Sequence, residues 1–240
     1  MKRCFKLGAM AVACAAGVMV SAGAANFTSS ADRLHEVGLF QGTGTTASGA
    51  PQYDLDRAPT RAEAAVMLVR LLGKEADAKA LTYTAPFTDL EGWEAPYVQY
   101  LYDNKLTTGA TATTFEPKAK CSAQMYTTFL LRSLGYSDAQ NGDFTYTGAL
   151  DFAADNVGLI DESFCDTNNF LRDNVAAMSL EALAAPVKAT DITLLDKLIA
   201  DGAIDQSKAA PLSSFIDLAE SYNKAVSTPI TRAEQDVTTR

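Results

Sequence analysis

The chain repeats itself, and the repeat restricts the possible folds more than any other feature. Residues 60–73 align without a gap on residues 122–135, and a third copy over residues 171–183 keeps part of the pattern. The positions shared by the first two copies are apolar or glycine: Leu68, Leu72 and Gly73 over Leu130, Leu134 and Gly135. A segment typical of a helix end running into a turn precedes each copy, at residues 34–42, 101–109 and 154–161. Three such helix–loop–helix units, each too small to bury its apolar face alone, should pack on one another.

The first copy has the signals of an amphipathic helix. Thr60 and Glu63 have the spacing of a capping box, and Gly73 stands where a left-handed C-terminal cap is favoured. One apolar stripe follows the cap: Ala65, Leu68, Val69 and Leu72. Arg61 does not fit, because the helix dipole disfavours a cation at the first helical position by roughly 0.3–1 kcal/mol. Together with the free amides of a helix start, this cation predicts an anion-binding site.

Composition limits the class of partner. The 240 residues are 48% hydrophobic and 20% charged, which is typical of an ordinary folded protein of one or two domains. The net charge of −9 and the pI near 4.6 argue against nucleic acid, because no basic stripe is available to neutralise phosphates. An anion must therefore be bound locally, against the mean field of the molecule.

Residues 1–25 have the pattern of an export leader. Lys2, Arg3 and Lys6 precede an apolar core over residues 7–20, and small residues at 22–24 or 23–25 offer a cleavage site. The apolar core is too short for a membrane-spanning helix. We expect a secreted protein, with no stable membrane insertion after the leader is removed.

Two cysteines remain after cleavage, and their state is left open. Cys121 and Cys165 either form a disulfide or stay as two buried apolar thiols. No His–Cys spacing supports zinc, and we expect no metal and no cofactor. His35, the single histidine of the sequence, is predicted on a helix surface, without a partner for nucleophilic or acid–base work.

Residues 30–186 resemble the S-layer homology (SLH) modules of bacterial surface proteins. The most specific stretch is Thr60-Arg-Ala-Glu63 with its apolar helix. The run from Phe87 through Trp93 to Tyr97 is similar to the opening motif of a module, and residues 106–117 are similar to its inter-helix loop. The resemblance implies a mostly α fold, in which three modules form a pseudo-threefold assembly with grooves between neighbours.

The implied domain organisation has five parts. They are the leader at 1–25, modules at 26–86, 87–137 and 138–186, and a short helical tail at 187–240. In the tail, residues 191–200 and 212–226 are predicted helices. Residues 231–234 repeat the letters Thr-Arg-Ala-Glu, but no apolar stripe follows them, and we interpret the match as chance.

The resemblance also implies a function at the cell wall or cell surface of a bacterium. SLH modules bind secondary cell-wall polysaccharide, often one carrying pyruvate ketals, and the Arg of their Thr-Arg-Ala-Glu motif meets the carboxylate of the glycan. By position, this Arg is Arg61 in the first module and Arg172 in the third, while Asp89 and Trp93 belong to the opening motif of the second. The candidate glycan-binding residues are Arg61, Glu63, Asp89, Trp93 and Arg172.

The chain departs from the family pattern in two of its copies. The second copy has Ala123 in the Arg slot, with Gln124 and Met125 after it. The third has Arg172 but lacks the Thr and Glu, and the first module lacks an opening motif of its own. At most two of the three grooves are therefore expected to hold a glycan carboxylate.

Each candidate residue has a structural alternative. Arg61 could be a solvated surface residue, Glu63 only a cap, and Asp89 only a helix N-cap. Trp93 either stacks on sugar or is packed in the core. Arg172 either binds the ligand or pairs with a neighbouring acid, Asp173 or Glu162.

The sequence leaves three classes of function to compare. The first is anchoring through wall polysaccharide, and the second is an interaction module that keeps the fold, has degenerate glycan sites and docks other surface proteins. The absence of an Arg at Ala123 favours the second. The third, a wall hydrolase, lacks a recognisable acid–base pair of carboxylates, and we expect no enzyme and no catalytic residue.

Overall fold

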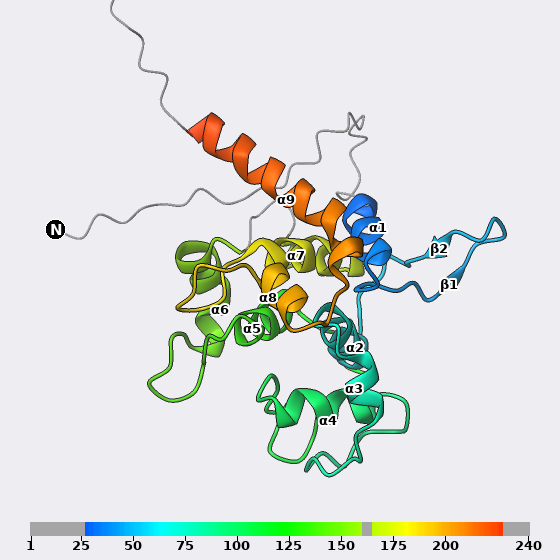
Figure 1. Cartoon of the computed structure of the whole chain (residues 1–240). Helices are drawn as coiled ribbons and strands as arrows, with labels where there is room; N and C mark the ends of the chain where they lie inside the picture. Colours follow the sequence, from blue (N-terminus) through cyan, green and yellow to red (C-terminus); the bar gives the residue numbers. More distant parts are fainter. Residues whose placement is uncertain (1–26, 160–164, 228–240) are drawn as a thin grey trace, which may run out of the picture.

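The computed structural model describes residues 27–159 and 165–227, and this part of the chain is mostly helical (Figure 1). The predicted mostly α fold is confirmed. The helices are α1 Thr28–Glu36, α2 Arg61–Leu71, α3 Glu75–Lys79, α4 Ala95–Asp103, α5 Ala123–Ser133, α6 Ala149–Phe152, α7 Arg172–Ala184, α8 Leu194–Ala200 and α9 Gln206–Ser227. The 3-10 helix η1 (Tyr146–Gly148) precedes α6, and the π-helix η2 (Ala153–Val157) follows it. Strands β1 (Gly44–Thr45) and β2 (Pro51–Gln52) form a small antiparallel hairpin.

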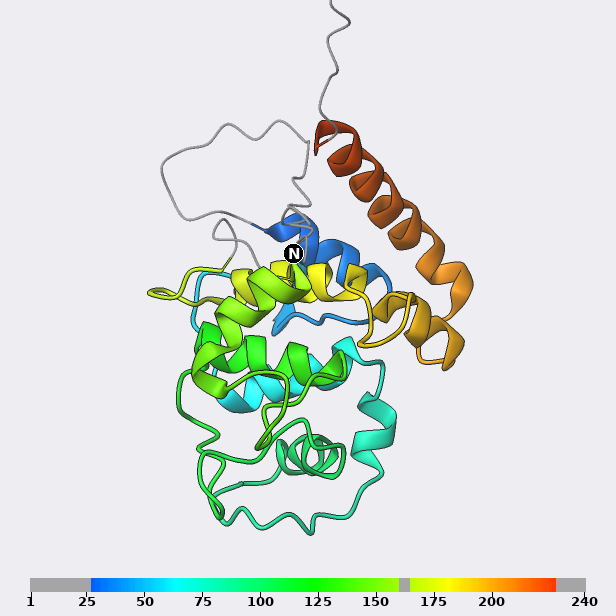
Figure 2. The ribbon, with the colours of Figure 1, turned by 90° about the vertical axis from the view of Figure 1, so that its left-hand side faces the viewer.

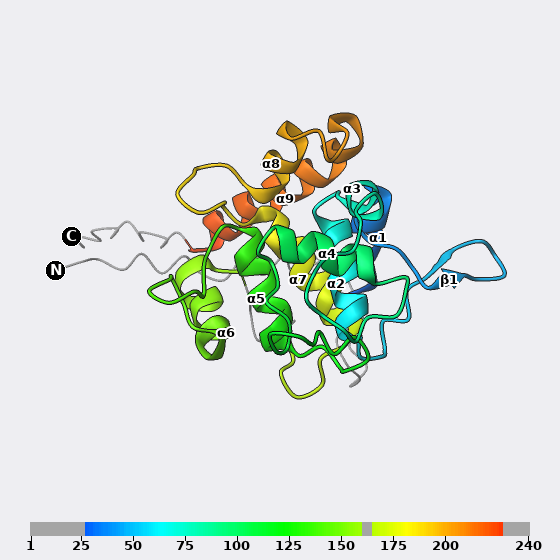
Figure 3. The same ribbon diagram turned by 90° about the horizontal axis from the view of Figure 1, so that it is seen from below.

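The three repeat copies form the central helices α2, α5 and α7, which lie near the middle of the view in Figure 3. Helix α5 contacts both α2 and α7. The four residues of the predicted stripe in α2 are buried, but so are neighbours such as Ala64, Val66 and Met67. Every residue of α7 is buried. The prediction of a single apolar stripe was therefore too narrow, because these helices are covered on almost every side.

The starts of the central helices follow from local sequence. The capping box of α2 is confirmed, because the Thr60 hydroxyl accepts from the Glu63 amide and the Glu63 carboxylate accepts from the Thr60 amide. Ser122 caps α5 by accepting from the Met125 amide at 3.2 Å. At the other end of α2, Gly73 has a φ of +65°, which confirms the left-handed position.

The outer helices pack across the predicted module boundaries. Helix α4 packs on α2, α6 packs on α5, and α1 packs on α7. In each pair, the first helix of one predicted module covers the second helix of another. The three pairings close a cycle in which the two ends of the repeat region meet. The division into three modules itself stays a prediction.

The tail adds α8 and α9 at one side of the molecule (Figure 2). Helix α8 starts three residues later than the predicted segment, because Thr193 and Asp196 form its capping box. Helix α9 is longer than predicted and contains Pro211. Its Phe215 ring lies 3.7 Å from the guanidinium carbon of Arg33 in α1, which ties the tail to the repeat region.

Several predictions fall on residues outside the described part of the chain. They are the leader at 1–25, the second Thr-Arg-Ala-Glu stretch at 231–234 and the last residues of the 154–161 segment. Within residues 27–159 and 165–227, no helix combines the length and the apolar character that a membrane span requires.

Candidate functional site

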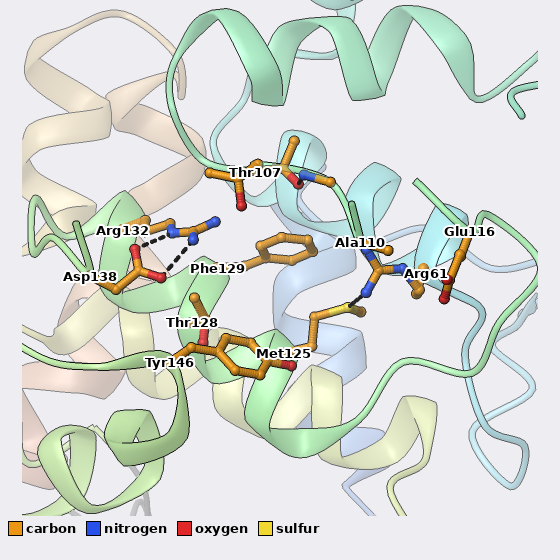
Figure 4. A pocket seen from close by; sticks show the side chains of 12 residues that line it. Arg61, Thr107, Ala110, Glu116, Met125, Thr128, Phe129, Arg132, Asp138 and Tyr146 are labelled. Carbon is orange, nitrogen blue, oxygen red and sulfur yellow. Dashed lines mark hydrogen bonds and ion pairs between the residues drawn. The ribbon is translucent and has the colours of Figure 1, made fainter. Parts of the chain in front are cut away.

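The first candidate site is a cavity of about 400 Å³ beside Arg61, called here the Arg61 cavity (Figure 4). The start of α2 forms one wall, the loop after α4 a second wall and α5 a third. Figure 4 shows Arg61 and Arg132 at opposite ends of the view, with Phe129 between them. The cavity therefore joins segments that lie far apart in the sequence.

Arg61 is held in place from the α4–α5 loop. Its Nε donates to the Phe115 carbonyl at 2.7 Å, its Nη1 lies 2.6 Å from the Met125 sulfur, and its guanidinium lies 5.0 Å from the Phe115 ring centre. No hydrogen bond or ion pair engages its Nη2 in the described structure, so one charge-bearing donor remains for a ligand. Arg61 is thus a partly buried cavity residue, and the alternative of a solvated surface residue is wrong.

The amides at the start of α2 do not assist Arg61. The amide of Arg61 donates to the Ala119 carbonyl at 2.8 Å, that of Ala62 to Pro117, and that of Glu63 to Thr60. The prediction that free helix-start amides would help to bind an anion is therefore wrong. The loop before α5 and the Thr60 hydroxyl occupy them, so the positive charge that α2 presents to this cavity comes from the side chain of Arg61.

Arg132 and Asp138, at the other end of the cavity, were not among the predicted site residues. Arg132 donates to both carboxylate oxygens of Asp138 at 2.8 and 2.7 Å and to the Leu106 carbonyl at 2.9 Å. Burial alone would raise the pKa of Asp138, but the hydrogen bonds and charge of Arg132 hold it below its ordinary value. A signal for Arg132 was present, because Arg70 and Arg132 coincide in the ungapped alignment.

The remaining wall suits a polar ligand with one apolar face. Thr107, Thr128 and Tyr146 contribute hydroxyl groups, and Phe129 contributes an aromatic surface. Glu116 lines the cavity at the Arg61 end and adds a carboxylate there. A sugar ring with an anionic substituent combines the hydroxyls, the apolar face and the charge that this wall can bind.

A second cavity, called here the Arg172 cavity, is lined by the first residue of α7, as the Arg61 cavity is lined by the first residue of α2. It measures about 140 Å³ and lies between the start of α7, the loop after α1 and one face of α2. Arg172 is 3% exposed, and its Nε donates to the Tyr53 carbonyl at 2.8 Å. Its Nη1 lies 3.5 Å from the Met67 sulfur and its Nη2 3.5 Å from the Gln41 carbonyl. All three nitrogens are therefore engaged by the protein.

Arg172 does not form the predicted pair with Asp173, whose carboxylate instead accepts from the Phe27 amide at 2.7 Å. The other proposed partner, Glu162, lies outside the described residues. Burial lowers the pKa of Arg172, and the charges of Arg57 and Glu63 act on it in opposite directions. The guanidinium of Arg172 is thus a buried link between α7 and the loop after α1.

Glu63 and Trp93 both line the Arg172 cavity and a neighbouring pocket that reaches Lys118. Glu63 is a cap and also forms two hydrogen bonds with Arg57, at 2.9 and 2.6 Å. Burial alone would raise the pKa of Glu63, but these contacts and the Thr60 amide hold it below its ordinary value. Trp93 is 60% exposed, so the alternative of a packed core residue is wrong.

Asp89 fastens the inter-helix loop rather than a helix. Its carboxylate accepts from the amides of Phe115 and Glu116 at 2.8 and 2.7 Å. The alternative of a helix N-cap is therefore wrong. Asp89 fixes the loop whose Phe115 carbonyl holds Arg61, so it acts on the Arg61 cavity through its neighbours.

The start of α5 lacks the first arginine, and α7 lacks the second. Ala123 occupies the Arg slot and is 2% exposed. In the alignment of the three copies, the position of Arg70 and Arg132 corresponds in α7 to Glu181, which is buried. Among residues 27–159 and 165–227, no group of His, Cys, Asp and Glu could hold a metal ion. Both cysteines are free thiols in the structure; Cys121 is buried, as the second alternative predicted, whereas Cys165 is only half-buried.

Comparisons with known proteins identify one domain within the chain. Residues 86–122 match the model of the S-layer homology domain, so the chain carries one such domain, spanning α4 and the loop that leads to α5. The chain is 30% identical over 112 residues to the middle cell wall protein of Brevibacillus brevis (strain 47 / JCM 6285 / NBRC 100599) and equally similar to a surface layer protein of Brevibacillus choshinensis. Each of these alignments covers 46% of this chain and 10% of the relative.

A third relative, an endoglucanase of Bacillus sp. (strain KSM-635), is 28% identical over 109 residues, which are 40% of this chain and 12% of that protein. The chain thus spans about a tenth of the length of these relatives. The domain match and the names of the two Brevibacillus relatives support localisation at the cell surface.

Proposed function

We propose that this protein is a non-covalent anchor at the bacterial cell surface. In this proposal the Arg61 cavity binds an acidic sugar of a secondary cell-wall polysaccharide, and a pyruvate ketal is the acidic group that we expect. The observation that carries the proposal is the guanidinium of Arg61, which lines a cavity of about 400 Å³ and keeps one nitrogen without a protein partner. The SLH domain at residues 86–122 supplies the loop that holds Arg61.

The unengaged Nη2 of Arg61 makes this cavity better suited to an anion than the Arg172 cavity, although the carboxylate of Glu116 also lines it. In the Arg61 cavity, the charge of Arg132 is cancelled by Asp138, and Met125 stands at the third helical position beside Arg61. In the Arg172 cavity, the equivalent position is Glu63, and the carbonyls of the protein already accept from the guanidinium. We therefore assign the main glycan site to Arg61 and a weaker, Trp93-centred contact to the Arg172 cavity.

The second candidate is a module that docks other surface proteins. Ala123 and Glu181 favour it for the start of α5, where no arginine stands at the position equivalent to Arg61 and Arg172. Both functions can be distinguished by one residue, because only glycan binding requires the free nitrogen of Arg61. Neither candidate requires a catalytic group.

The test is co-sedimentation of the exported protein with purified bacterial cell walls. Native walls are compared with walls from which acid has removed the secondary polymer, using wild type, Arg61→Ala and Arg57→Ala. Arg57→Ala is the matched control, because it removes a cation near the same helix end without touching the Arg61 cavity. Loss of one charge-assisted hydrogen bond is worth about 1.5–3 kcal/mol, so Arg61→Ala should weaken binding about 10- to 100-fold.

We expect binding to native walls only, with Arg57→Ala close to wild type. A pyruvylated monosaccharide should compete with the wall, and the same sugar without the ketal should not. Binding that is indifferent to both stripping and Arg61→Ala would remove the glycan proposal. The docking alternative would then predict retention by wall protein, and protease treatment of the walls would abolish it.

A further inference from the structure

Glu94 has a buried carboxylate oxygen to which the protein donates no hydrogen bond. The residue directly precedes α4 and is 4% exposed. Its carboxylate accepts from the Glu91 amide through Oε1 at 2.8 Å, whereas Oε2 has no hydrogen-bond partner in the described part of the chain. None of the ion pairs among the described residues includes Glu94. A buried carboxylate is stable when it has both a donor and a counter-charge, and here one donor and the charge are missing.

Helix α4 does not use this oxygen as a cap. The amide of Ala95 donates to the Gly92 carbonyl at 3.2 Å. The amide of Tyr97 donates to the backbone carbonyl of Glu94 at 3.1 Å, and Pro96 has no amide hydrogen to donate. The side chain of Glu94 therefore caps no amide of the helix, and its second oxygen remains for a molecule from outside.

Glu94 lines the pocket that reaches Lys118, called here the Glu94 pocket. The pocket has a volume of about 240 Å³ and lies between the start of α2 and the turn before α4. Two further carboxylates line it, and both are paired. Glu63 pairs with Arg57 at 2.6 Å. Glu91 pairs with Lys118 at 3.0 Å, so the charge of Glu94 is the one in this wall that no ion pair balances.

We propose that the Glu94 pocket binds the ammonium group of an amino sugar. Trp93 lines the same pocket and is 60% exposed, and its indole can stack on a sugar ring and attract a cation. An ammonium donates the missing hydrogen bond to Oε2 of Glu94 and also neutralises its charge, whereas a neutral hydroxyl supplies only the hydrogen bond. The negative net charge of the chain favours a cation at this surface as well.

The Glu94 pocket and the Arg61 cavity adjoin the same two segments but share no lining residue. At the start of α2, Thr60 and Ala62 line the pocket, and Arg61 between them lines the cavity. In the loop before α5, Pro117 lines the pocket and Glu116 lines the cavity. The pocket thus adds a site for a cationic sugar to the site for an acidic sugar in the proposed function. Each site binds its own monosaccharide without the other.

The experiment is a titration of the exported protein with three monosaccharides that differ at one ring position. They are glucosamine, N-acetylglucosamine and glucose, used at about pH 6.5, where a free amine is protonated. Trp93 is the single tryptophan of the sequence, so its fluorescence reports binding at this pocket. We expect glucosamine to change the fluorescence and to bind about tenfold more tightly than the other two sugars. Added salt should reduce this preference.

Glu94→Gln is the central variant. Its side-chain oxygen can still accept from the Glu91 amide, but it has no charge, so the affinity for glucosamine should fall about tenfold. Asp77→Asn is the matched control, because it removes one negative charge from α3 and leaves the pocket wall unchanged. Its affinity should stay within about twofold of wild type. Trp93→Ala changes an exposed residue that the fold tolerates, and ligand-observed NMR should show about threefold weaker binding.

Equal responses to glucosamine and glucose would overturn the proposal, as would the absence of any response to glucosamine. An affinity that Glu94→Gln leaves unchanged would also overturn it. If that variant does not fold, NMR on Trp93→Ala decides, and unchanged binding there has the same meaning. None of the three sugars carries an acidic group, so a negative result does not affect the Arg61 cavity. Failure of the wall co-sedimentation would in turn leave the response to glucosamine intact.

Discussion

The Arg61 and Arg172 cavities share a plan but differ in what their arginines are free to do. Each arginine is the first residue of a central helix and donates through Nε to a carbonyl of another segment. Arg172 is 3% exposed and engages the protein with all three nitrogens, whereas Arg61 keeps one nitrogen unengaged. The comparison indicates that such an arginine is first a structural link, and that ligand binding uses only the donor capacity that remains.

The two cavities also differ in the third residue of the helix that lines them, which is Glu63 in α2 and Met125 in α5. Glu63 completes the capping box of α2 and lines the Arg172 cavity, so helix stability and the local negative charge come from one residue. In α5 the equivalent residue is Met125, which leaves Ser122 as a single cap and places a sulfur instead of a carboxylate beside Nη1 of Arg61. Helix α5, which has the less complete cap, thus lies beside Arg61, whose guanidinium is more available to a ligand than that of Arg172.

Replacing each arginine by alanine should have the largest effect on this comparison. Arg172→Ala leaves the Tyr53 carbonyl without its donor inside the core and opens a void, so we expect a loss of about 3 kcal/mol in the free energy of unfolding. Arg61→Ala should cost about 1 kcal/mol, because its site is partly open to solvent. Urea denaturation of both variants measures the difference. Equal losses would show that the two arginines have the same structural role.

Met125→Glu should give the Arg61 cavity a carboxylate at the third helical position, as Glu63 provides in the Arg172 cavity. The new carboxylate would complete a capping box with Ser122 and raise stability by about 0.5–1 kcal/mol. It would also pair with Arg61, whose Nη1 lies 2.6 Å from the present sulfur, and lower the affinity for native walls about tenfold. Thermal denaturation and wall co-sedimentation measure the two changes, which have opposite signs.

Met125→Gln is the control for that variant. Glutamine can complete the same capping box but carries no charge, so wall affinity should stay within about threefold of wild type. If the Gln variant loses as much binding as the Glu variant, the shape of the cavity matters and the charge of Arg61 does not. That result would contradict the electrostatic difference between the two cavities.

Ionised Glu75 supports the rim of the Arg172 cavity, and acid should weaken it. Burial alone would raise the pKa of Glu75, but Arg70, Lys79 and Tyr97 lower it to about 2. The pKa in the folded state is thus below the ordinary value, so the stabilisation is complete above about pH 4.5 and is lost as pH falls toward 2. Glu75→Gln should lose about 1–2 kcal/mol at pH 7 and should show a shallower fall in Tm between pH 5 and 2.5. Parallel curves for the variant and wild type would contradict this.

Sequence predicted the local features of both cavities well. The capping box, the left-handed glycine and the place of Arg61 at a helix start depend on residues within four positions of one another. The depth of Arg172 could not be predicted, because its carbonyl partner Tyr53 lies 119 residues away. The same holds for the occupied amides of α2, since the partner loop begins more than 50 residues later.

The pairing of Arg132 and the exposure of Trp93 were not predictable from the sequence, for different reasons. Arg132 was visible in the alignment as the equivalent of Arg70, but its bidentate partner Asp138 is in a loop that follows no repeat pattern. The exposure of Trp93 depends on which helices cover the start of α4. From the sequence alone, a single tryptophan at a helix start is equally compatible with a core position and with an exposed sugar-binding position. Sequence therefore predicts which residues begin the helices, whereas packing decides which of them remain available to a ligand.

The smallest change in stability is expected for Trp93→Ala. The wall affinity of this variant decides whether the Arg172 cavity binds glycan at all. Because Trp93 is 60% exposed, Trp93→Ala should shift Tm by no more than about 1–2 °C. If its ring stacks on a sugar, the loss of about 0.5–1 kcal/mol should lower wall affinity about three- to fivefold. Tyr102→Ala is the control, because Tyr102 is an exposed aromatic residue on α4 that lines neither cavity. Wall affinity unchanged in Trp93→Ala would leave the Arg172 cavity with a structural role only, and the Arg61 cavity as the one glycan site among the described residues.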